Sequence, residues 1–174
     1  DSEEMFAPLA IGKKKDFQKH LNRYDVIHID IQWFLSNVNE LDHIVEYITD
    51  TVLAELRECY PEVITTGVVT LPDALSRIKN ATGQKFIVII DEWDVLIRDE
   101  AANVRVQNEY ISFLQGMFKG TEPTKYIQLA YLTGILPIKK DGSQSAISDF
   151  EEFTMVKPRK FAPYVGFTEQ EVKD

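Results

Sequence analysis

Residues 86–94 read Phe86-Ile-Val-Ile-Ile-Asp-Glu-Trp-Asp94, an apolar run that ends in adjacent carboxylates. The run has no alternation of apolar and polar residues, which predicts a strand covered on both faces, as in a parallel sheet between helices. Asp91 and Glu92 then fall at the carboxyl end of that strand, where open α/β sheets place their ligands. The stretch therefore predicts an α/β fold with a candidate site at one strand tip.

Strand-like and helix-like segments alternate on both sides of this stretch. A β-branched, mostly apolar run predicts a further strand at residues 26–31, and apolar runs predict another at residues 127–132 and a weak last strand at residues 153–156. Helical spacing of apolar residues, with capping residues at the ends, predicts helices at about residues 41–60, 70–83 and 103–118. Residues 137–150 are polar and are expected to form a loop. Strands that alternate with crossover helices indicate a mostly parallel sheet.

The composition narrows the classes of function. The 174 residues carry 19 basic and 28 acidic side chains, and the formal charge of −9 argues against a broad nucleic-acid-binding surface. Cys59 is the only cysteine, so no disulfide can form within the chain. There is no apolar stretch of about 18 residues, so we expect no membrane association and a cytoplasmic location.

An apolar strand that ends in Asp-Glu has the form of the Walker B segment of P-loop ATPases. In that interpretation Asp91 holds the Mg²⁺ shell, and Glu92, which is longer, orients the attacking water. Thr133 follows the strand at residues 127–132 and is a candidate sensor of the γ-phosphate or the water. Two alternatives stay open: a buried strand that returns to solvent through polar residues, and a turn threonine before Gly134.

Other polar residues are expected to be structural. Asp94 is interpreted as a cap of the next turn or as the partner of a basic neighbour. His28 lies within an apolar strand and is interpreted as an interior histidine rather than a metal ligand. Basic loop residues are expected to be solvated, although each could face phosphate: Arg98, Lys139, Lys140, Arg159 and Lys160.

Three segments resemble the bacterial AAA-ATPase-like family, whose members often carry a C-terminal PD-(D/E)xK nuclease-like domain. The segments are Ile90-Asp-Glu-Trp-Asp94, Tyr131-Leu-Thr-Gly-Ile-Leu-Pro-Ile-Lys139 and Tyr164-Val-Gly-Phe-Thr-Glu-Gln-Glu-Val172. The resemblance implies ATP and Mg²⁺ as cofactors, a Walker B pair at Asp91 and Glu92, and a sensor at Thr133. It also implies a three-layer P-loop sheet with strand order 5-1-4-3-2.

The departures from the family decide what we expect of residues 1–174. No phosphate-binding loop of the form G-x-x-x-x-G-K-[ST] occurs, so we expect a partial ATPase domain that lacks its first strand and is inactive by itself. The four predicted strands would be strands 2 to 5 of the family. Strand 4 would then have an exposed edge, which predicts self-association or a rearranged last strand.

Further expectations concern partners. Nucleic acid would be bound only through domains outside these residues. The alternative function is a non-catalytic module, derived from an ATPase fold, that binds a partner protein. Thr168 and Glu171 form a capping box and predict a short final helix.

Overall fold

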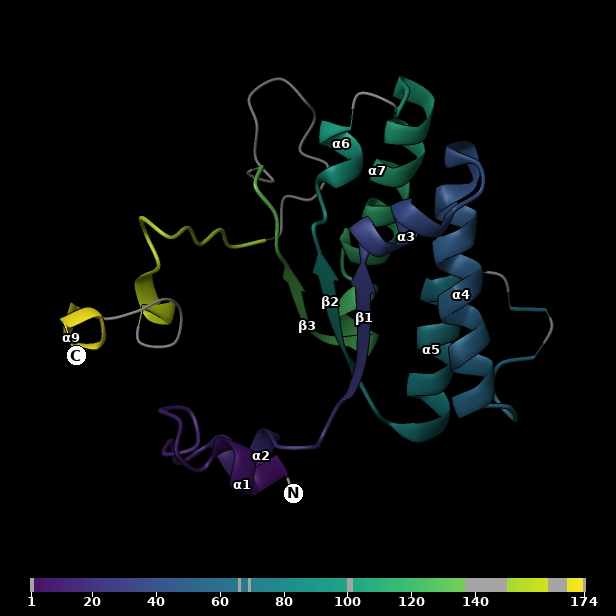
Figure 1. Cartoon of the computed structure of the whole chain (residues 1–174). Helices are drawn as coiled ribbons and strands as arrows, with labels where there is room; N and C mark the ends of the chain where they lie inside the picture. The colour runs from purple at the N-terminus through teal and green to yellow at the C-terminus, as the bar shows by residue number, and fades with distance from the viewer. Residues whose placement is uncertain are drawn as a thin grey trace. The chain divides into compact units, whose positions relative to one another are not determined.

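The computed structural model divides into two units, which are described separately (Figure 1). The larger unit spans Asp25–Phe150 and holds the sheet; the smaller combines Asp1–Tyr24 with Glu151–Asp174. The structure describes residues 2–65, 67–68, 70–99, 102–136, 150–162 and 169–173. The predicted loop at residues 137–150 and the capping residue Thr168 therefore lie, apart from Phe150, outside the described residues.

A parallel sheet of β1 (Asp25–Asp30), β2 (Phe86–Asp91) and β3 (Ile127–Leu132) forms the centre of the larger unit. The strand order is β1-β2-β3 among the described residues, and both pairs are parallel. This confirms the predicted α/β fold. The first strand ends one residue earlier than predicted, because Asp30 accepts a hydrogen bond from the N–H of Trp33 and starts a helix at Ile31.

Helices connect the strands at the positions that the capping residues predict. The described helices of this unit are α3 (Ile31–Asn37), the 3₁₀ turn η1 (Leu41–His43), α4 (Ile44–Cys59), α5 (Leu71–Thr82), α6 (Val95–Arg98), α7 (Val104–Phe118) and α8 (Pro123–Tyr126). Thr70 and Asn103 cap α5 and α7, and Gly83 ends α5 with φ of 78°. The sequence did not predict α3.

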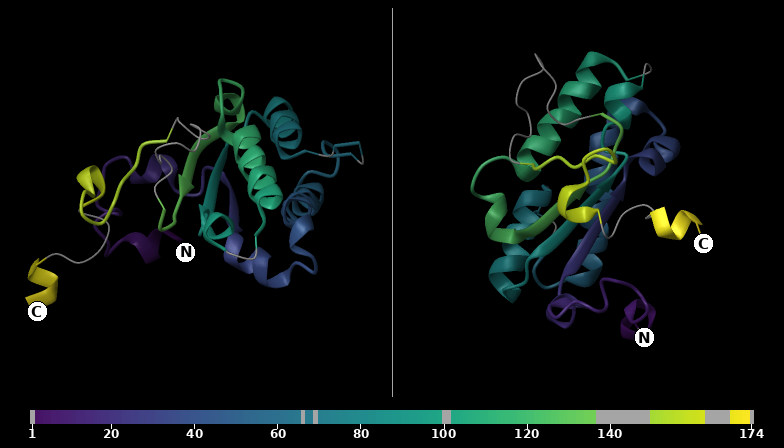
Figure 2. Two further views of the ribbon diagram at one scale, coloured as in Figure 1. Left: turned by 90° about the horizontal axis from the view of Figure 1, so that it is seen from above. Right: turned by 90° about the vertical axis from the view of Figure 1, so that its left-hand side faces the viewer.

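The helices α4, α5 and α7 pack together on one face of the sheet (Figure 2). Both crossovers move along the sheet in the same direction, from β1 to β2 to β3, and right-handed connections then place their helices on the same side. The core lies between these layers, and from β1 and β2 it takes Ile27, Ile29, Phe86, Val88 and Ile90.

The opposite face of the sheet carries no helix of this unit within the described ranges, so the expected third layer is not seen there. Val26, Leu129 and Tyr131 are 55%, 54% and 45% exposed. The residues of β2 on this face are half-buried, so the prediction that β2 is covered on both faces is met in full on the helix face and in part on the other. His28 is also exposed, and its interpretation as an interior histidine is wrong.

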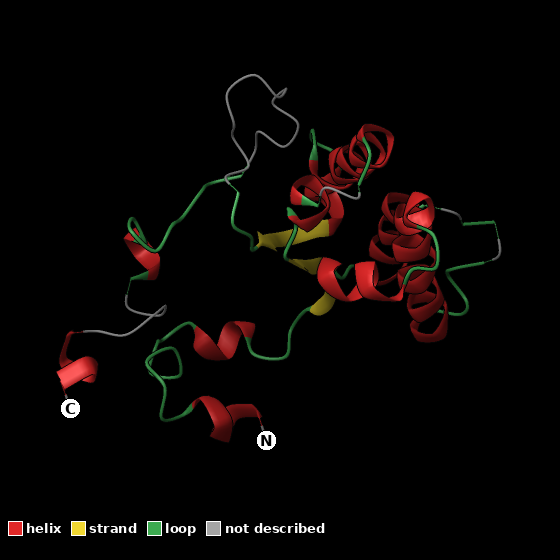
Figure 3. Ribbon diagram, turned by 45° about the horizontal axis from the view of Figure 1, so that its top comes forward, coloured by secondary structure: helices red, strands yellow, loops and turns green. Residues whose placement is uncertain are grey.

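The smaller unit consists of short helices and loops: α1 (Ser2–Phe6), α2 (Phe17–His20), the 3₁₀ turn η2 (Arg159–Phe161) and α9 (Glu169–Lys173). The predicted strand at residues 153–156 is wrong, since no strand is drawn there (Figure 3). Thr154 and Lys157 instead exchange backbone hydrogen bonds in a turn, and Phe153 packs on Phe161 with ring centroids 4.5 Å apart. The predicted final helix is present as α9.

None of the described helices is long and apolar enough to cross a bilayer.

Candidate functional site

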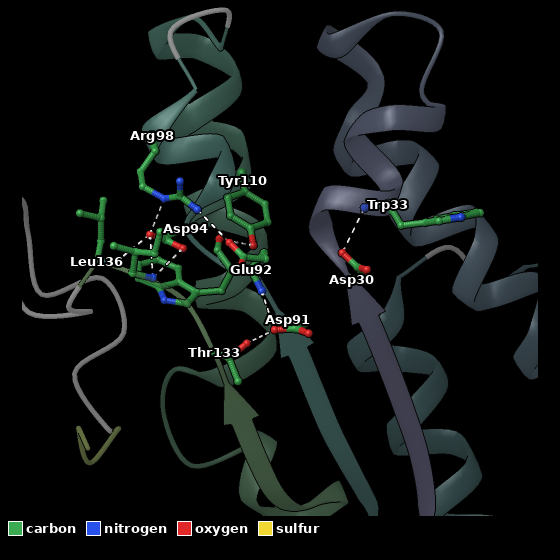
Figure 4. Close-up of polar contacts among 11 residues, drawn as sticks. Asp30, Trp33, Asp91, Glu92, Asp94, Arg98, Tyr110, Thr133 and Leu136 are labelled. Carbon is green, nitrogen blue, oxygen red and sulfur yellow. Dashed lines mark hydrogen bonds and ion pairs between the residues drawn. The ribbon is translucent and has the colours of Figure 1, made fainter. Parts of the chain in front are cut away.

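Polar side chains follow or end three strands at the carboxyl edge of the sheet, where those of Asp91 and Thr133 point toward each other (Figure 4). β1 and β2 are paired so that Asp30 and Asp91 are Cα partners. Thr133 directly follows β3, and its N–H donates to the carbonyl oxygen of Ile90 at 3.0 Å. Asp30 and Asp91 alternate with buried residues, which puts both on the face away from the helices.

Asp91 and Thr133 are joined by a hydrogen bond. The Thr133 hydroxyl donates to Oδ1 of Asp91, and the same oxygen accepts the N–H of Glu92 at 3.1 Å. Oδ2 of Asp91 has no hydrogen-bond partner among the described residues. The two predicted residues are therefore together, with one carboxylate oxygen left to bind a ligand.

The oxygen donors at this edge suit Mg²⁺. Mg²⁺ prefers oxygen ligands and is usually held by one or two carboxylates together with substrate phosphates and water. The described residues contain no group of three His, Cys, Asp or Glu side chains that could enclose a metal ion. Asp91 and Asp30 are the carboxylates at this edge of the sheet.

Glu92 lies beside Asp91 but is turned toward α6. Its φ of 52° is in the left-handed region, which is uncommon for a residue other than glycine and is often found at functional sites. Its Oε2 lies 2.8 Å from Nη2 of Arg98, and both side chains are partly exposed. Arg98, expected to be solvated or to face phosphate, is instead paired with this carboxylate.

Asp94 is fully buried and bound on several sides. It accepts hydrogen bonds from Nε of Arg98 at 2.8 Å and from the N–H groups of Leu136 and Ile135 at 2.7 and 3.2 Å. Burial alone would raise the pKa of Asp94, but the bonds from Leu136, Arg98 and Ile135 lower it below its ordinary value. The interpretation of Asp94 as a structural residue with a basic neighbour is confirmed.

Gly134 allows this close contact between the two strand tips. A Cβ atom at Gly134 would lie 2.7 Å from Cδ1 and 2.9 Å from Nε1 of Trp93, and it would also collide with Asp94. At the residue before Gly134, the carbonyl oxygen of Thr133 accepts a hydrogen bond from the N–H of Trp93 at 2.9 Å. The backbone on both sides of the Thr133 side chain is therefore fixed.

Side chains of the helix α7 form hydrogen bonds with the turn between β2 and α6 and with α6 itself. The Tyr110 hydroxyl, which is buried, donates to the carbonyl oxygen of Trp93 at 2.8 Å. Burial raises the pKa of Tyr110, so the hydroxyl remains a donor. The Gln107 amide donates to the carbonyl oxygens of Leu96 and Ile97 at 3.4 and 3.3 Å. These bonds hold Glu92, Asp94 and Arg98 to the helix layer.

Sequence analysis missed Asp30 as a site residue. The pattern was available, because residues 25–30 are a mostly apolar strand ending in Asp, as residues 86–91 are. Of the remaining basic candidates, Arg159 and Lys160 belong to the smaller unit, where Glu151 lies 3.2 and 3.5 Å from them. Lys139 and Lys140 are outside the described residues.

Comparison with known proteins identifies a family. The model of the AAA-ATPase-like family, described as "Predicted AAA-ATPase", matches residues 1–143. No curated protein and no solved structure matches the chain. The matched range contains the three strands and all of the strand-tip residues described above.

Proposed function

The chain belongs to the family of predicted AAA-ATPases, and from this we propose that it is the part of a Mg²⁺-dependent ATPase domain that carries the acidic strand tips. The observation that supports the proposal most is the hydrogen bond from Thr133 to Asp91 at the carboxyl ends of adjacent parallel strands. The 174 residues include no G-x-x-x-x-G-K-[ST] sequence. The proposal therefore includes a phosphate-binding loop supplied by residues outside them.

Asp91 is assigned the role of a metal ligand, and Thr133 is assigned the role of orienting the Asp91 carboxylate. Mg²⁺, when bound with ATP, would neutralise charge on the phosphate oxygens. The free Oδ2 of Asp91 is the oxygen available to hold it. The Thr133 hydroxyl donates a hydrogen bond to Oδ1, which fixes the carboxylate plane and leaves the hydroxyl lone pairs to accept from a water at the same edge.

Glu92 is assigned the role of orienting the attacking water. In the structure Arg98 holds its carboxylate at 2.8 Å, so Glu92 has to exchange this contact for a water. The exchange leaves no buried charge unpaired, because Arg98 keeps its bond to Asp94. Catalytic hydrogen bonds often form only in the substrate complex, so the ion pair is compatible with this role.

The test is turnover by a protein that includes its phosphate-binding loop. Glu92→Gln should lower the rate of ATP hydrolysis by about 10²- to 10³-fold and change ATP affinity by less than about threefold, since a neutral amide orients but does not accept a proton. Glu109→Gln, an equal change at an exposed position of α7, should leave both unchanged. Normal turnover by Glu92→Gln would assign the water to another group.

A non-catalytic interaction module is the second candidate. The observation that favours it is the ion pair between Glu92 and Arg98, which occupies the carboxylate that catalysis requires. In that case the pair would stabilise the turn after β2, and Glu92→Gln would affect stability alone. An unaltered phosphate-binding loop in the full protein supports the ATPase, whereas a decayed loop supports the module.

A further inference from the structure

The strand β1 forms an edge of the sheet, and its outer side faces α4 (Figure 1). Among the described residues, its backbone pairs only with β2. In a parallel sheet alternate residues direct their N–H and C=O groups to opposite sides, so part of the β1 backbone points outward without a backbone partner. Such an edge is a template for another strand.

A groove of about 310 Å³ runs along this edge, and we call it the β1 groove. One wall is β1 from Asp25 to His28, and the other is α4 from Thr51 to Cys59, with Tyr60 directly after it. Its floor consists of core side chains that are no more than 6% exposed: Phe34, Val52, Leu56 and Phe86. An unpaired backbone beside an apolar floor provides both features that strand addition uses, namely main-chain hydrogen bonds and a pocket for side chains.

The charges on the groove wall are of one sign. Asp25 and Glu55 line the groove, and neither Lys nor Arg does. Glu55 is exposed and forms no ion pair with the described residues, whereas Asp25 accepts a hydrogen bond from the Tyr60 hydroxyl at 2.7 Å. The occupant that complements this wall is a strand with basic side chains.

We propose that the β1 groove binds an extended, basic segment of a partner protein, which joins the sheet as a strand beside β1. Its backbone pairs with the outer edge of β1, its apolar side chains cover the groove floor, and its Lys or Arg side chains reach Asp25 and Glu55. This inference does not depend on the proposed function, because the β1 groove lies where β1 and β2 begin, whereas Asp91 is at the other end of β2.

The probe for the test is a fluorescent peptide of about eight residues, with Val residues in its centre, Lys residues near both ends and blocked termini. Fluorescence anisotropy at low salt should give saturable binding. Glu55→Lys should weaken binding about five- to tenfold, because it replaces an attraction by a repulsion. Glu58→Lys alters the charge of the chain equally on the same helix, at an exposed position outside the groove, and should change affinity by less than about twofold.

Two further peptides test strand pairing directly. They keep the sequence and charge of the probe but carry N-methyl groups on either the odd or the even amides. At least one of them should lose about tenfold or more in affinity, because N-methylation removes the donors of one strand edge. Amide shifts in the NMR spectrum should change within β1 rather than β3.

Four results would overturn the proposal. These are no saturation below about 1 mM peptide, equal binding of the methylated and unmethylated peptides, an equal loss for Glu58→Lys and Glu55→Lys, and displacement of the peptide by a second copy of the chain. Thermal unfolding followed by circular dichroism shows whether each variant is folded. Glu55 and Glu58 are both exposed, so both variants should unfold within a few degrees of the parent protein.

Discussion

The buried carboxylate of Asp94 connects the turn after β2 to the segment after β3. Asp94→Ala would leave the N–H groups of Ile135 and Leu136, and Nε of Arg98, without their acceptor. We expect a loss of about 3 kcal/mol in the free energy of unfolding, measured with urea. Asp50→Ala, at an exposed position of α4, should change it by less than about 0.5 kcal/mol. Equal stability of the two variants would contradict the account.

The same carboxylate should make stability depend on acid pH. Its pKa is lower in the folded chain than the ordinary value of 3.8, so the unfolded state binds the proton more tightly. The stability from Asp94 is therefore complete above about pH 5 and is lost as pH falls through the folded pKa. Asp94→Asn should have a flatter decline of stability below about pH 5 in a series of urea titrations. A decline as steep as that of the parent would assign the effect to other carboxylates.

Gly134 should be required for packing at the strand tips. Gly134→Ala would place a methyl group against Trp93 and against Asp94, whose bonds prevent it from moving. We expect a loss of about 2 kcal/mol in the free energy of unfolding. Gly116→Ala is the control: it lies within α7 with no atom within 4 Å of the added Cβ, and it should stabilise by about 0.5–1 kcal/mol. Two losses of similar size would show that the contact at Gly134 is not specific.

The position of a single residue could be predicted from the sequence where that position depends on one strand or one helix alone. Asp91 follows directly from an apolar run, and Asp94 lies one helical turn before Arg98. The ion pair of Glu92 could not be foreseen, because it depends on the left-handed backbone at that residue. The exposure of His28 also could not be foreseen, since it depends on which face of the sheet the helices cover.

At the scale of elements, Asp30 ends β1 and starts α3. Asp30→Ala should lower the free energy of unfolding by about 1 kcal/mol, because the N–H of Trp33 loses its acceptor. Asp30→Asn keeps the cap and removes a charge beside Asp91, so its stability should equal or exceed that of the parent. Urea unfolding of the two variants separates the cap from the charge. A loss of about 1 kcal/mol for Asp30→Asn as well would show that the charge, and not the cap, matters.

The elements that the sequence predicts correctly are determined by residues within or next to each element. The strands β1 and β2 are rich in β-branched residues, β3 is mostly apolar, and α5 and α7 have side-chain caps at Thr70 and Asn103. The segment at residues 153–156 has a similar composition, but a strand also needs a partner strand. That segment forms a turn instead, with Val156 88% exposed. The short helix α3 was missed because seven residues give too little periodicity to detect.

At the scale of the whole molecule, exposed apolar side chains of the larger unit lie on one face of the sheet, beside the edge of β3, which pairs only with β2 among the described residues. We propose that this surface pairs with a second copy of the chain, which sedimentation velocity would detect as a dimer. Tyr131→Lys, on that face, should raise the dissociation constant about tenfold. Val104→Lys removes an apolar side chain that is 71% exposed on α7 and should leave it unchanged. A monomer at all concentrations would contradict the proposal.

The α/β class follows from alternating segments, but the sequence does not determine how the layers are arranged. That arrangement depends on the order of the strands. Two crossovers in the same direction place α4, α5 and α7 on one side of the sheet. The local sequence of a crossover does not determine in which direction along the sheet it runs. The resemblance to a family supplied the order, and with it the expected position of Asp91 next to Thr133.

The central claim is that Asp91 at the tip of β2 holds the metal of a Mg²⁺–ATP complex. The most direct measurement is calorimetric titration of ATP, with and without Mg²⁺, into a chain that includes the phosphate-binding loop and into its Asp91→Asn variant. We predict that Mg²⁺ increases ATP affinity at least about tenfold in the parent and has little effect in Asp91→Asn, while affinities without Mg²⁺ are equal. An equal gain from Mg²⁺ in both proteins would contradict the account.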